Sequence, residues 1–455
     1  MLFRICAVIL CAVTSKAGDW PRLGGPEATW VSLESPLARS WPTNGPPTLW
    51  TVNVGEGFAG PSVYEGSVYL EDRQANQQDI LRCFSLATGE EEWRLAFDAP
   101  GTLPYNGSRN VPTVNKDYIF CVGPFGQLRC VSREKHELIW NHNLIDEFKD
   151  SEYDLREPRN REESLARAQV PTWGFTQAPL LYRDLVIAAP QTRSTGMVAY
   201  EQSTGKLRWK SGYIGRNWYS HMSPYLTTLC GVEQVIMLAQ PSDPEKSPDD
   251  APPAIISSIS PSTGKILWTN QTPAPDKIPI AEPVRIGTNR LFITGGYGLG
   301  CFALEVTHSN GNWETRILFH NRTVAGHIHS PVFYKGRIYE TSFKEHRGTH
   351  TGLVCVEPDG RPVWQTGPDL QFESGPFLIA DGMVFILNGR TGELNLFDIT
   401  DDQPRLLSKA KVLDAKDGKA WAPMALSNGK LLLRDQHQLK CLDVASTKEK
   451  IAPVR

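Results

Sequence analysis

The chain has 455 residues, of which 40% are hydrophobic and 21% are charged, so it is long and apolar enough to bury a large core. This composition excludes an intrinsically disordered chain, and a formal net charge of −3 gives no electrostatic basis for binding nucleic acid or an anionic membrane. The 38 glycines and 34 prolines follow no collagen period, which indicates many short turns and favours an all-β fold.

The first 17 residues predict a secretory signal peptide. Arg4 is followed by an apolar run over residues 5–13 and by Ser15-Lys16-Ala17, which is a small-x-small cleavage pattern. The run is too short to cross a bilayer, for which about 20 residues are needed. We therefore expect cleavage near Ala17, no transmembrane segment, and an exported protein in the periplasm or outside the cell. A buried N-terminal strand in a cytosolic protein is the alternative.

A small or polar residue followed by proline recurs along the rest of the chain, at intervals of 45 to 67 residues. This spacing is close to the ~40 to 50 residues of a four-stranded propeller blade, if the two longest intervals hold insertions at about residues 144–170 and 241–254. The pattern occurs eight times and therefore predicts eight blades. The prolines are Pro61, Pro112, Pro179, Pro224, Pro283, Pro331, Pro376 and Pro423.

Strand and turn signals alternate after each of these prolines. A turn such as Lys335-Gly336 comes first, then a β-rich segment such as LVIAA (185–189), then a third apolar segment and a second turn. A tryptophan follows the second turn in most copies, and we expect its ring to pack between neighbouring blades. These residues are Trp93, Trp140, Trp209, Trp268 and Trp364, while Trp313 holds the place loosely in one copy and the copy after Phe377 has none.

The last copy, residues 423–444, supplies three strands and no tryptophan. Residues 49–54 precede the first proline and form an extra strand-like segment that carries the unassigned Trp50. We predict that this segment completes the last blade, because ring closure removes an exposed sheet edge. The predicted fold is thus all-β: a single eight-bladed β-propeller of four-stranded antiparallel blades over residues 49–455, after an N-terminal extension over residues 18–48.

Three of the turn-and-tryptophan copies carry a family resemblance. They are residues 88–93 (TGEEEW), 204–209 (TGKLRW) and 263–268 (TGKILW). These copies resemble the tryptophan-docking motif of pyrroloquinoline-quinone (PQQ)-like propeller repeats, and the resemblance covers nearly the whole mature chain. It implies the fold and leaves the chemistry open. That family includes quinoprotein alcohol dehydrogenases, the lipoprotein BamB of outer-membrane protein assembly, and many exported proteins without an assigned activity. Residues 20–26 (WPRLGGP) of this chain resemble the start of members of this last group.

The resemblance also implies how a cofactor would be held. Quinoprotein dehydrogenases bind PQQ over the propeller axis, with Ca²⁺ on acidic and amide side chains, an Asp base, a Trp stacked on the cofactor and, in many members, two adjacent cysteines. This chain has no Cys-Cys pair, and no Asp can be placed with a Ca²⁺ set. We therefore assign no catalytic residue and no metal site, and leave PQQ and calcium open.

The residues just before each repeat proline are expected to line the axis, because the innermost strand of each blade surrounds it. Convergent polar groups in a funnel are a ligand-site hypothesis, and a water-filled channel is the alternative. His327 and His329 lie two apart and would project to one side, but a metal would need a third ligand, so a solvated or core pair is favoured. The candidate ligand-binding residues are Arg109, Trp173, Gln177, His221, Glu282, His329, Glu373 and Trp421.

These observations favour a non-catalytic binding or scaffold module that acts after export and presents its faces and loops to a protein or polysaccharide partner. No nucleic-acid partner is expected, and a monomer is compatible with the sequence. The alternative is a PQQ-dependent quinoprotein dehydrogenase that oxidises alcohols, with its site on the propeller axis.

Overall fold

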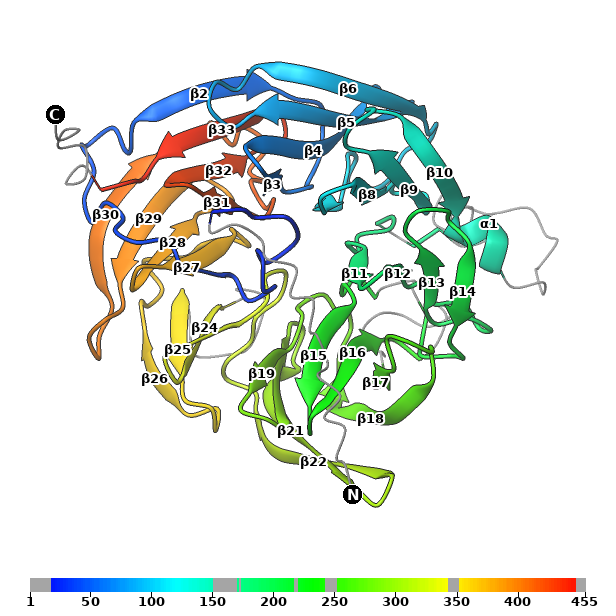
Figure 1. The fold of residues 1–455 in the computed structure, drawn as a ribbon. Coiled ribbons are helices and arrows are strands. Elements are labelled where there is room, and N and C mark those ends of the chain that lie inside the picture. Colours follow the sequence, from blue (N-terminus) through cyan, green and yellow to red (C-terminus); the bar gives the residue numbers. More distant parts are fainter. Residues whose placement is uncertain are drawn as a thin grey trace, which may run out of the picture.

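The computed structural model describes residues 18–149, 170–171, 173–216, 220–241, 252–342 and 352–446. They form eight antiparallel sheets, arranged as blades around one axis, and the chain passes from each blade to the next around the ring (Figure 1). This confirms the predicted all-β, eight-bladed propeller. The predicted signal peptide and most of both predicted insertions lie outside the described residues.

In seven blades the first strand begins directly after the repeat proline, and in blade eight it begins two residues after Pro423; the strands of each blade follow one another outward from the axis. A short helix, α1 (Leu144–Phe148), leaves blade two where the first insertion was predicted; its N-cap, Asn143, accepts hydrogen bonds from the backbone of Ile145 and Asp146. Blades one to four are β3 (Ser62–Tyr64), β4 (Ser67–Gln74), β5 (Gln78–Ser85) and β6 (Glu91–Asp98); β7 (Thr113–Val114), β8 (Tyr118–Val122), β9 (Gln127–Ser132) and β10 (Leu138–Asn143); β11 (Leu180–Tyr182), β12 (Leu185–Ala188), β13 (Val198–Glu201) and β14 (Leu207–Lys210); and β15 (Tyr225–Leu229), β16 (Val232–Ala239), β17 (Pro253–Ile259) and β18 (Ile266–Pro275).

The second half of the ring repeats this plan. Among the described residues, no helix is long and apolar enough to cross a membrane. Blades five to eight are β19 (Val284–Ile286), β20 (Arg290–Gly295), β21 (Gly300–Ser309) and β22 (Asn312–Asn321); β23 (Val332–Tyr334), β24 (Arg337–Thr341), β25 (Leu353–Val356) and β26 (Pro362–Gln365); β27 (Phe377–Ala380), β28 (Met383–Leu387), β29 (Glu393–Asp398) and β30 (Arg405–Lys411); and β31 (Ala425–Ser427), β32 (Lys430–Arg434), β33 (Gln438–Asp443) and β2 (Thr48–Asn53).

The ring closes through the predicted N-terminal strand. β2 pairs antiparallel with β33, with Trp50 opposite Cys441. Both ends of the propeller therefore share one blade, and the edge that β33 would otherwise expose is covered.

Three of the tryptophans join one blade to the next by the same contact. The Nε1 of Trp209 donates a hydrogen bond to the carbonyl of Pro261 at 3.1 Å, and its ring lies so close to Gly264 that an added Cβ would be 2.5 Å from the ring. Trp50 contacts Leu86 and Gly89 in the same way, and Trp140 contacts Gln202 and Gly205. The glycine of the Thr-Gly turn thus has two roles: it adopts the positive φ of the turn, and its lack of a side chain leaves room for the neighbouring ring. Trp209, Trp268 and Trp364 are buried, whereas Trp93 and Trp140 are half-buried.

Blade five uses a phenylalanine at this position, and the assignment of Trp313 was wrong. Phe319 lies opposite Ala303 beside a β-bulge, the register that the docking tryptophans share, and its ring contacts Gly360 of the next blade. Trp313 instead stacks on His308 with ring centroids 4.0 Å apart at the end of the β21–β22 hairpin. This hairpin is longer than most others in the ring, so the first tryptophan after the turn falls short of the docking position.

The N-terminal extension crosses the axis before it joins the ring (Figure 1). Trp20 exchanges two backbone hydrogen bonds of 2.8 Å with Val63 in blade one, and the backbone N–H of Val114 in blade two donates to the carbonyl of Pro21. The backbone N–H of Ile379 in blade seven donates to the carbonyl of Trp30, after which β1 (Val31–Ser32) pairs in parallel with β27. We call residues 18–32 the N-terminal strap, because they tie together blades on different sides of the ring.

Candidate functional site

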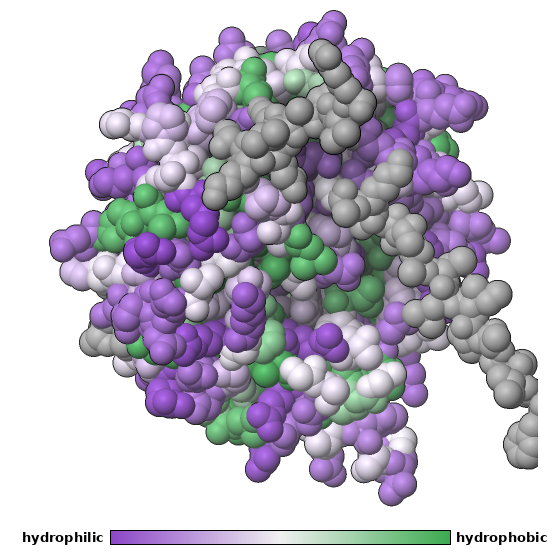
Figure 2. Space-filling view, turned by 60° about the vertical axis from the view of Figure 1, so that its left-hand side comes forward, coloured by the Kyte–Doolittle hydropathy of each residue, from purple (hydrophilic) through white to green (hydrophobic). Residues whose placement is uncertain are grey.

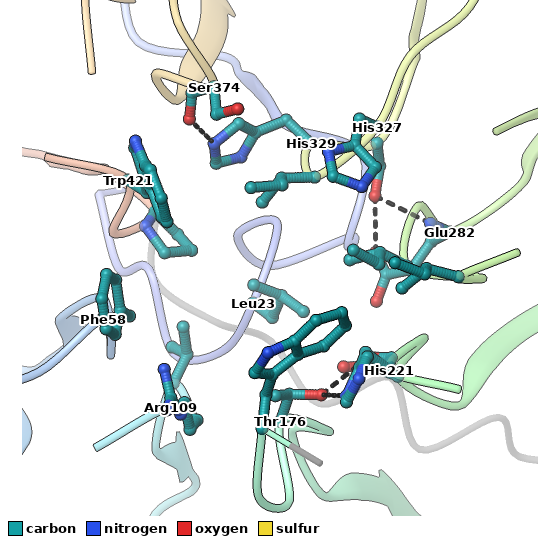
Figure 3. A pocket seen from close by; sticks show the side chains of 18 of the residues that line it. Leu23, Phe58, Arg109, Thr176, His221, Glu282, His327, His329, Ser374 and Trp421 are labelled. Carbon is teal, nitrogen blue, oxygen red and sulfur yellow. Dashed lines mark hydrogen bonds between the residues drawn. The ribbon is translucent and has the colours of Figure 1, made fainter. Parts of the chain in front are cut away.

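A cavity of about 440 Å³ lies on the axis and receives side chains from all eight blades. The N-terminal strap contributes Leu23 and Trp30 to its lining. Figure 3 shows the labelled residues around this cavity, with Leu23 between them. From blade one to blade eight, the lining includes Phe58, Arg109, Thr176, His221, Ile280, Ile328, Glu373 and Trp421.

A common register explains this convergence. In seven blades the residue three positions before the repeat proline lines the cavity, and in blade eight Trp421, two positions before Pro423, takes the place. These residues lie in the segments that lead into the innermost strands, just outside the strands themselves. Because all innermost strands begin at the same end of the ring, their lead-in segments meet at one depth along the axis.

Seven of the eight candidate residues line the cavity, namely Arg109, Trp173, His221, Glu282, His329, Glu373 and Trp421. Gln177 does not: it is buried, and its Nε2 donates to the Oε1 of Gln191 at 2.6 Å. Neighbouring residues of an extended segment point in opposite directions, so Thr176 faces the cavity while Gln177 points away from it. Whether these residues bind a ligand stays a prediction.

The sequence alone did not identify several lining residues, among them Phe58, Tyr105, Thr176, Tyr297 and the strap residue Leu23. The register of three before proline would have found Phe58 and Thr176. Tyr105 and Tyr297 lie farther from the prolines and carry no repeat signal.

Arg109 is the most exceptional group of the site. Its Nε and Nη2 atoms are buried and have no hydrogen-bond partner among the described residues, and its Cζ lies 5.0 Å from the centre of the Phe58 ring. Burial, with a contribution from the charge of Arg73, lowers the pKa of Arg109 to about 9. The guanidinium is therefore a largely desolvated cation without a paired carboxylate.

An aromatic wall stands beside this guanidinium. The rings of Phe58 and Trp421 stack with centroids 5.6 Å apart, and Tyr105 lies 6.0 Å from Trp421. The Nζ of Lys419 lies 4.9 Å from the centre of the Tyr105 ring. The indole Nε1 of Trp421 is buried and has no hydrogen-bond partner within the described segments, so this wall offers flat apolar surface and one unused donor.

The opposite side of the cavity carries neutral histidines. The Nδ1 of His221 lies 3.0 Å from the hydroxyl of Thr176, and no described residue provides a hydrogen-bond partner for its Nε2. Burial, together with the charge of Arg109, lowers the pKa of His221 to about 3. His329, whose Nε2 contacts the carbonyl of Ser374 at 2.9 Å, has a pKa lowered by burial to about 4. Both rings are uncharged at neutral pH.

Glu282 is a buried acid of the same lining. Burial raises its pKa to about 8, although the nearby Arg22 of the strap opposes the shift. At neutral pH the carboxyl is therefore mostly protonated and can donate a hydrogen bond. His327 also lines the cavity, but within the described ranges no three His, Cys, Asp or Glu side chains form a group that could hold a metal ion.

Comparisons with known proteins agree with the fold. The model of the family described as outer membrane protein assembly factor BamB matches residues 76–346, and no curated protein matches the chain. BamB from Moraxella catarrhalis has a similar structure, with a TM-score of 0.57 and 10% sequence identity over 89% of this chain and 99% of that chain.

Two oxidoreductase structures are similar as well. Quinohemoprotein alcohol dehydrogenase from Comamonas testosteroni has a TM-score of 0.62 at 13% identity, covering 97% of this chain and 82% of that chain. A europium-containing methanol dehydrogenase has a TM-score of 0.63 at 13% identity, covering 94% and 90%. At such identities these similarities show the fold alone.

Proposed function

The chain belongs to the β-propeller family described as outer membrane protein assembly factor BamB, and from this membership we propose that it is an exported, non-catalytic binding module with the axial cavity as its ligand site. Its outer faces and loops would serve a protein or polysaccharide partner. On the face shown in Figure 2, hydrophobic residues form separate patches on a mostly hydrophilic surface.

The observation that carries this proposal is the lining of the cavity. Its volume of about 440 Å³ lies within the range of small-molecule sites, and its walls are aromatic and aliphatic with a few polar groups. Arg109, His221 and Trp421 each have a buried nitrogen for which the described ranges supply no hydrogen-bond partner. Buried polar groups are normally satisfied, so a ligand that supplies the missing partners is the simplest physical explanation.

Native mass spectrometry of the mature protein, purified from the exported fraction, tests the proposal. A ligand retained at one equivalent, together with a partner captured by cross-linking on intact cells, is the expected result. A chain found only in the cytoplasm, or one that retains no ligand from a cell extract, would count against it.

A PQQ-dependent quinoprotein dehydrogenase is the second candidate, favoured by the two dehydrogenases of similar structure. The described residues fit its cofactor poorly: Arg109 could pair with a PQQ carboxylate, but no cluster of acidic side chains for Ca²⁺ is present among them. We therefore derive no reaction step through PQQ. Tight retention of PQQ with Ca²⁺, together with dye-linked oxidation of alcohols, would establish this candidate in place of the binding module.

A further inference from the structure

We propose that the axial cavity binds a small organic monocarboxylate, with the carboxylate paired to Arg109 and a flat apolar body against Phe58 and Trp421. This inference rests on the proposed function, since it names the class of ligand that the same cavity takes. It follows from the charge, the shape and the unsatisfied groups of the cavity.

The charge of Arg109 is the first argument. Its guanidinium lines the cavity, and its Nε and Nη2 atoms are buried with no acceptor in the part of the chain that the structure describes. Desolvating a cation is costly unless an anion or several hydrogen bonds compensate it. The contact with the Phe58 ring, 5.0 Å from Cζ, supplies only part of that compensation. A carboxylate is the anion whose two oxygens match the planar donors of a guanidinium.

The charges around the cavity point the same way. Arg390 lines the cavity and is exposed, and the ammonium groups of Lys419 and Lys277 lie 4.9 and 5.2 Å from the rings of the lining residues Tyr105 and Tyr297. Among the described residues, the acidic members of the lining are Glu373 and Glu282, and Glu282 is mostly protonated at neutral pH. The field at the site therefore attracts an anion.

The number of buried charges limits the ligand to a single carboxylate. Away from Arg109, the buried part of the lining includes the neutral rings of His221 and His329 and apolar groups such as Leu23 and Ile280, whereas the other lining arginine, Arg390, is exposed to solvent. A second or third carboxylate against the buried groups would have no desolvated counter-charge, at a high desolvation cost. A planar tricarboxylate such as PQQ therefore fits this lining less well than a monocarboxylate does.

The aromatic wall selects the body of the ligand. Phe58 and Trp421 are stacked at an interplanar angle of 28°, and they form a surface against which a further flat ring can pack at the usual centroid separation of about 4.5 to 7 Å. The unused Nε1 of Trp421 and Nε2 of His221 would bind polar substituents on that body. Aryl carboxylates and ring-shaped sugar acids both have this form.

The test is calorimetric titration of the mature protein, residues 18–455, with benzoate, indole-3-acetate and glucuronate, each beside its neutral amide. We expect at least one acid to bind, with its amide at least ~10-fold weaker, because the amide cannot form a charge-assisted pair. The R109K variant should bind that acid ~10-fold more weakly and R109Q ~100-fold more weakly. The ligand-free R109Q variant should melt no lower than the parent protein, because it removes an uncompensated charge.

The exposed Arg183 in the first turn of blade three supplies the matched control, and R183Q should bind like the parent protein. Equal binding of acid and amide, unchanged affinity in both Arg109 variants, or failure of all three acids would overturn the proposal. So would tighter binding of PQQ with Ca²⁺. If all three acids fail while native mass spectrometry still finds a retained ligand, the monocarboxylate assignment fails and the binding module stands; if no ligand is retained from any source, both fail.

Discussion

Replacing Trp209 with alanine is expected to destabilise the propeller by roughly 3–5 kcal/mol, the usual cost of truncating a large buried aromatic side chain. Trp209 is 9% exposed, and its ring fills the space over Gly264 of the next blade. Roughly 1 kcal/mol of the loss should come from the hydrogen bond between Nε1 and the Pro261 carbonyl. The W209F variant keeps an aromatic ring and should therefore recover more than half of the stability.

The assay is urea unfolding monitored by circular dichroism. The free energies of unfolding of the parent protein, W209A and W209F are compared under the condition that the three have equal m-values. Trp313 provides the matched control, because it is a half-buried tryptophan that stacks on the exposed His308 away from the docking position. W313A should cost less, about 1 kcal/mol, because this ring is only half-buried at the outside of a core cluster. A loss below ~1 kcal/mol for W209A, or equal losses for W209A and W313A, would refute the role of the docking contact.

Three further predictions follow from the same structure. The G264A variant should lose more than ~1 kcal/mol of stability, because a φ of +73° is strained for alanine and the added Cβ would be 2.5 Å from the Trp209 ring. The G336A variant, with a φ of +85° and open space around the added Cβ, isolates the cost of the backbone strain. Equal losses of stability for the two variants in urea unfolding would argue against the ring contact. Deletion of the N-terminal strap, residues 18–32, should remove hydrogen-exchange protection from the amides of Val63, Val114 and Ile379, which donate to it, and unchanged protection would show that the strap does not hold the blades. Because burial raises the pKa of Glu282 from 4.5 to about 8, the folded chain keeps a proton that the unfolded chain releases, so the free energy of unfolding should fall as pH rises between these values. The E282Q variant should flatten that part of the stability curve, and a curve identical to that of the parent protein would contradict the raised pKa.

The blade count and the closure of the ring could be predicted from the sequence, because they depend on short-range signals that repeat. Each proline marks the start of an innermost strand, and the Thr-Gly turns at Gly89, Gly205 and Gly264 each lie against the tryptophan ring of the preceding blade. The last copy has only three strands, and an extra strand stands before the first copy. Pairing of these two segments completes the last blade and closes the ring. Such patterns do not depend on the angles between blades.

The position of the cavity could be predicted only in part. The prolines locate the segments that meet at the axis, but a shift of one residue turns a side chain away, as Thr176 and Gln177 show. In blade five the length of the β21–β22 hairpin moves the docking position from Trp313 to Phe319. Composition alone gives no signal for either choice.

The N-terminal strap was decided by tertiary structure alone. Residues 18–32 share no repeat with the blades, and their partners Val63, Val114 and Ile379 are spread across the sequence. Arg22 lies near Glu282, and Leu23 lines the cavity, only because the ring brings distant blades together. A repeat is encoded locally, once in each blade, whereas the contents of the axis depend on how all eight blades are placed at the same time.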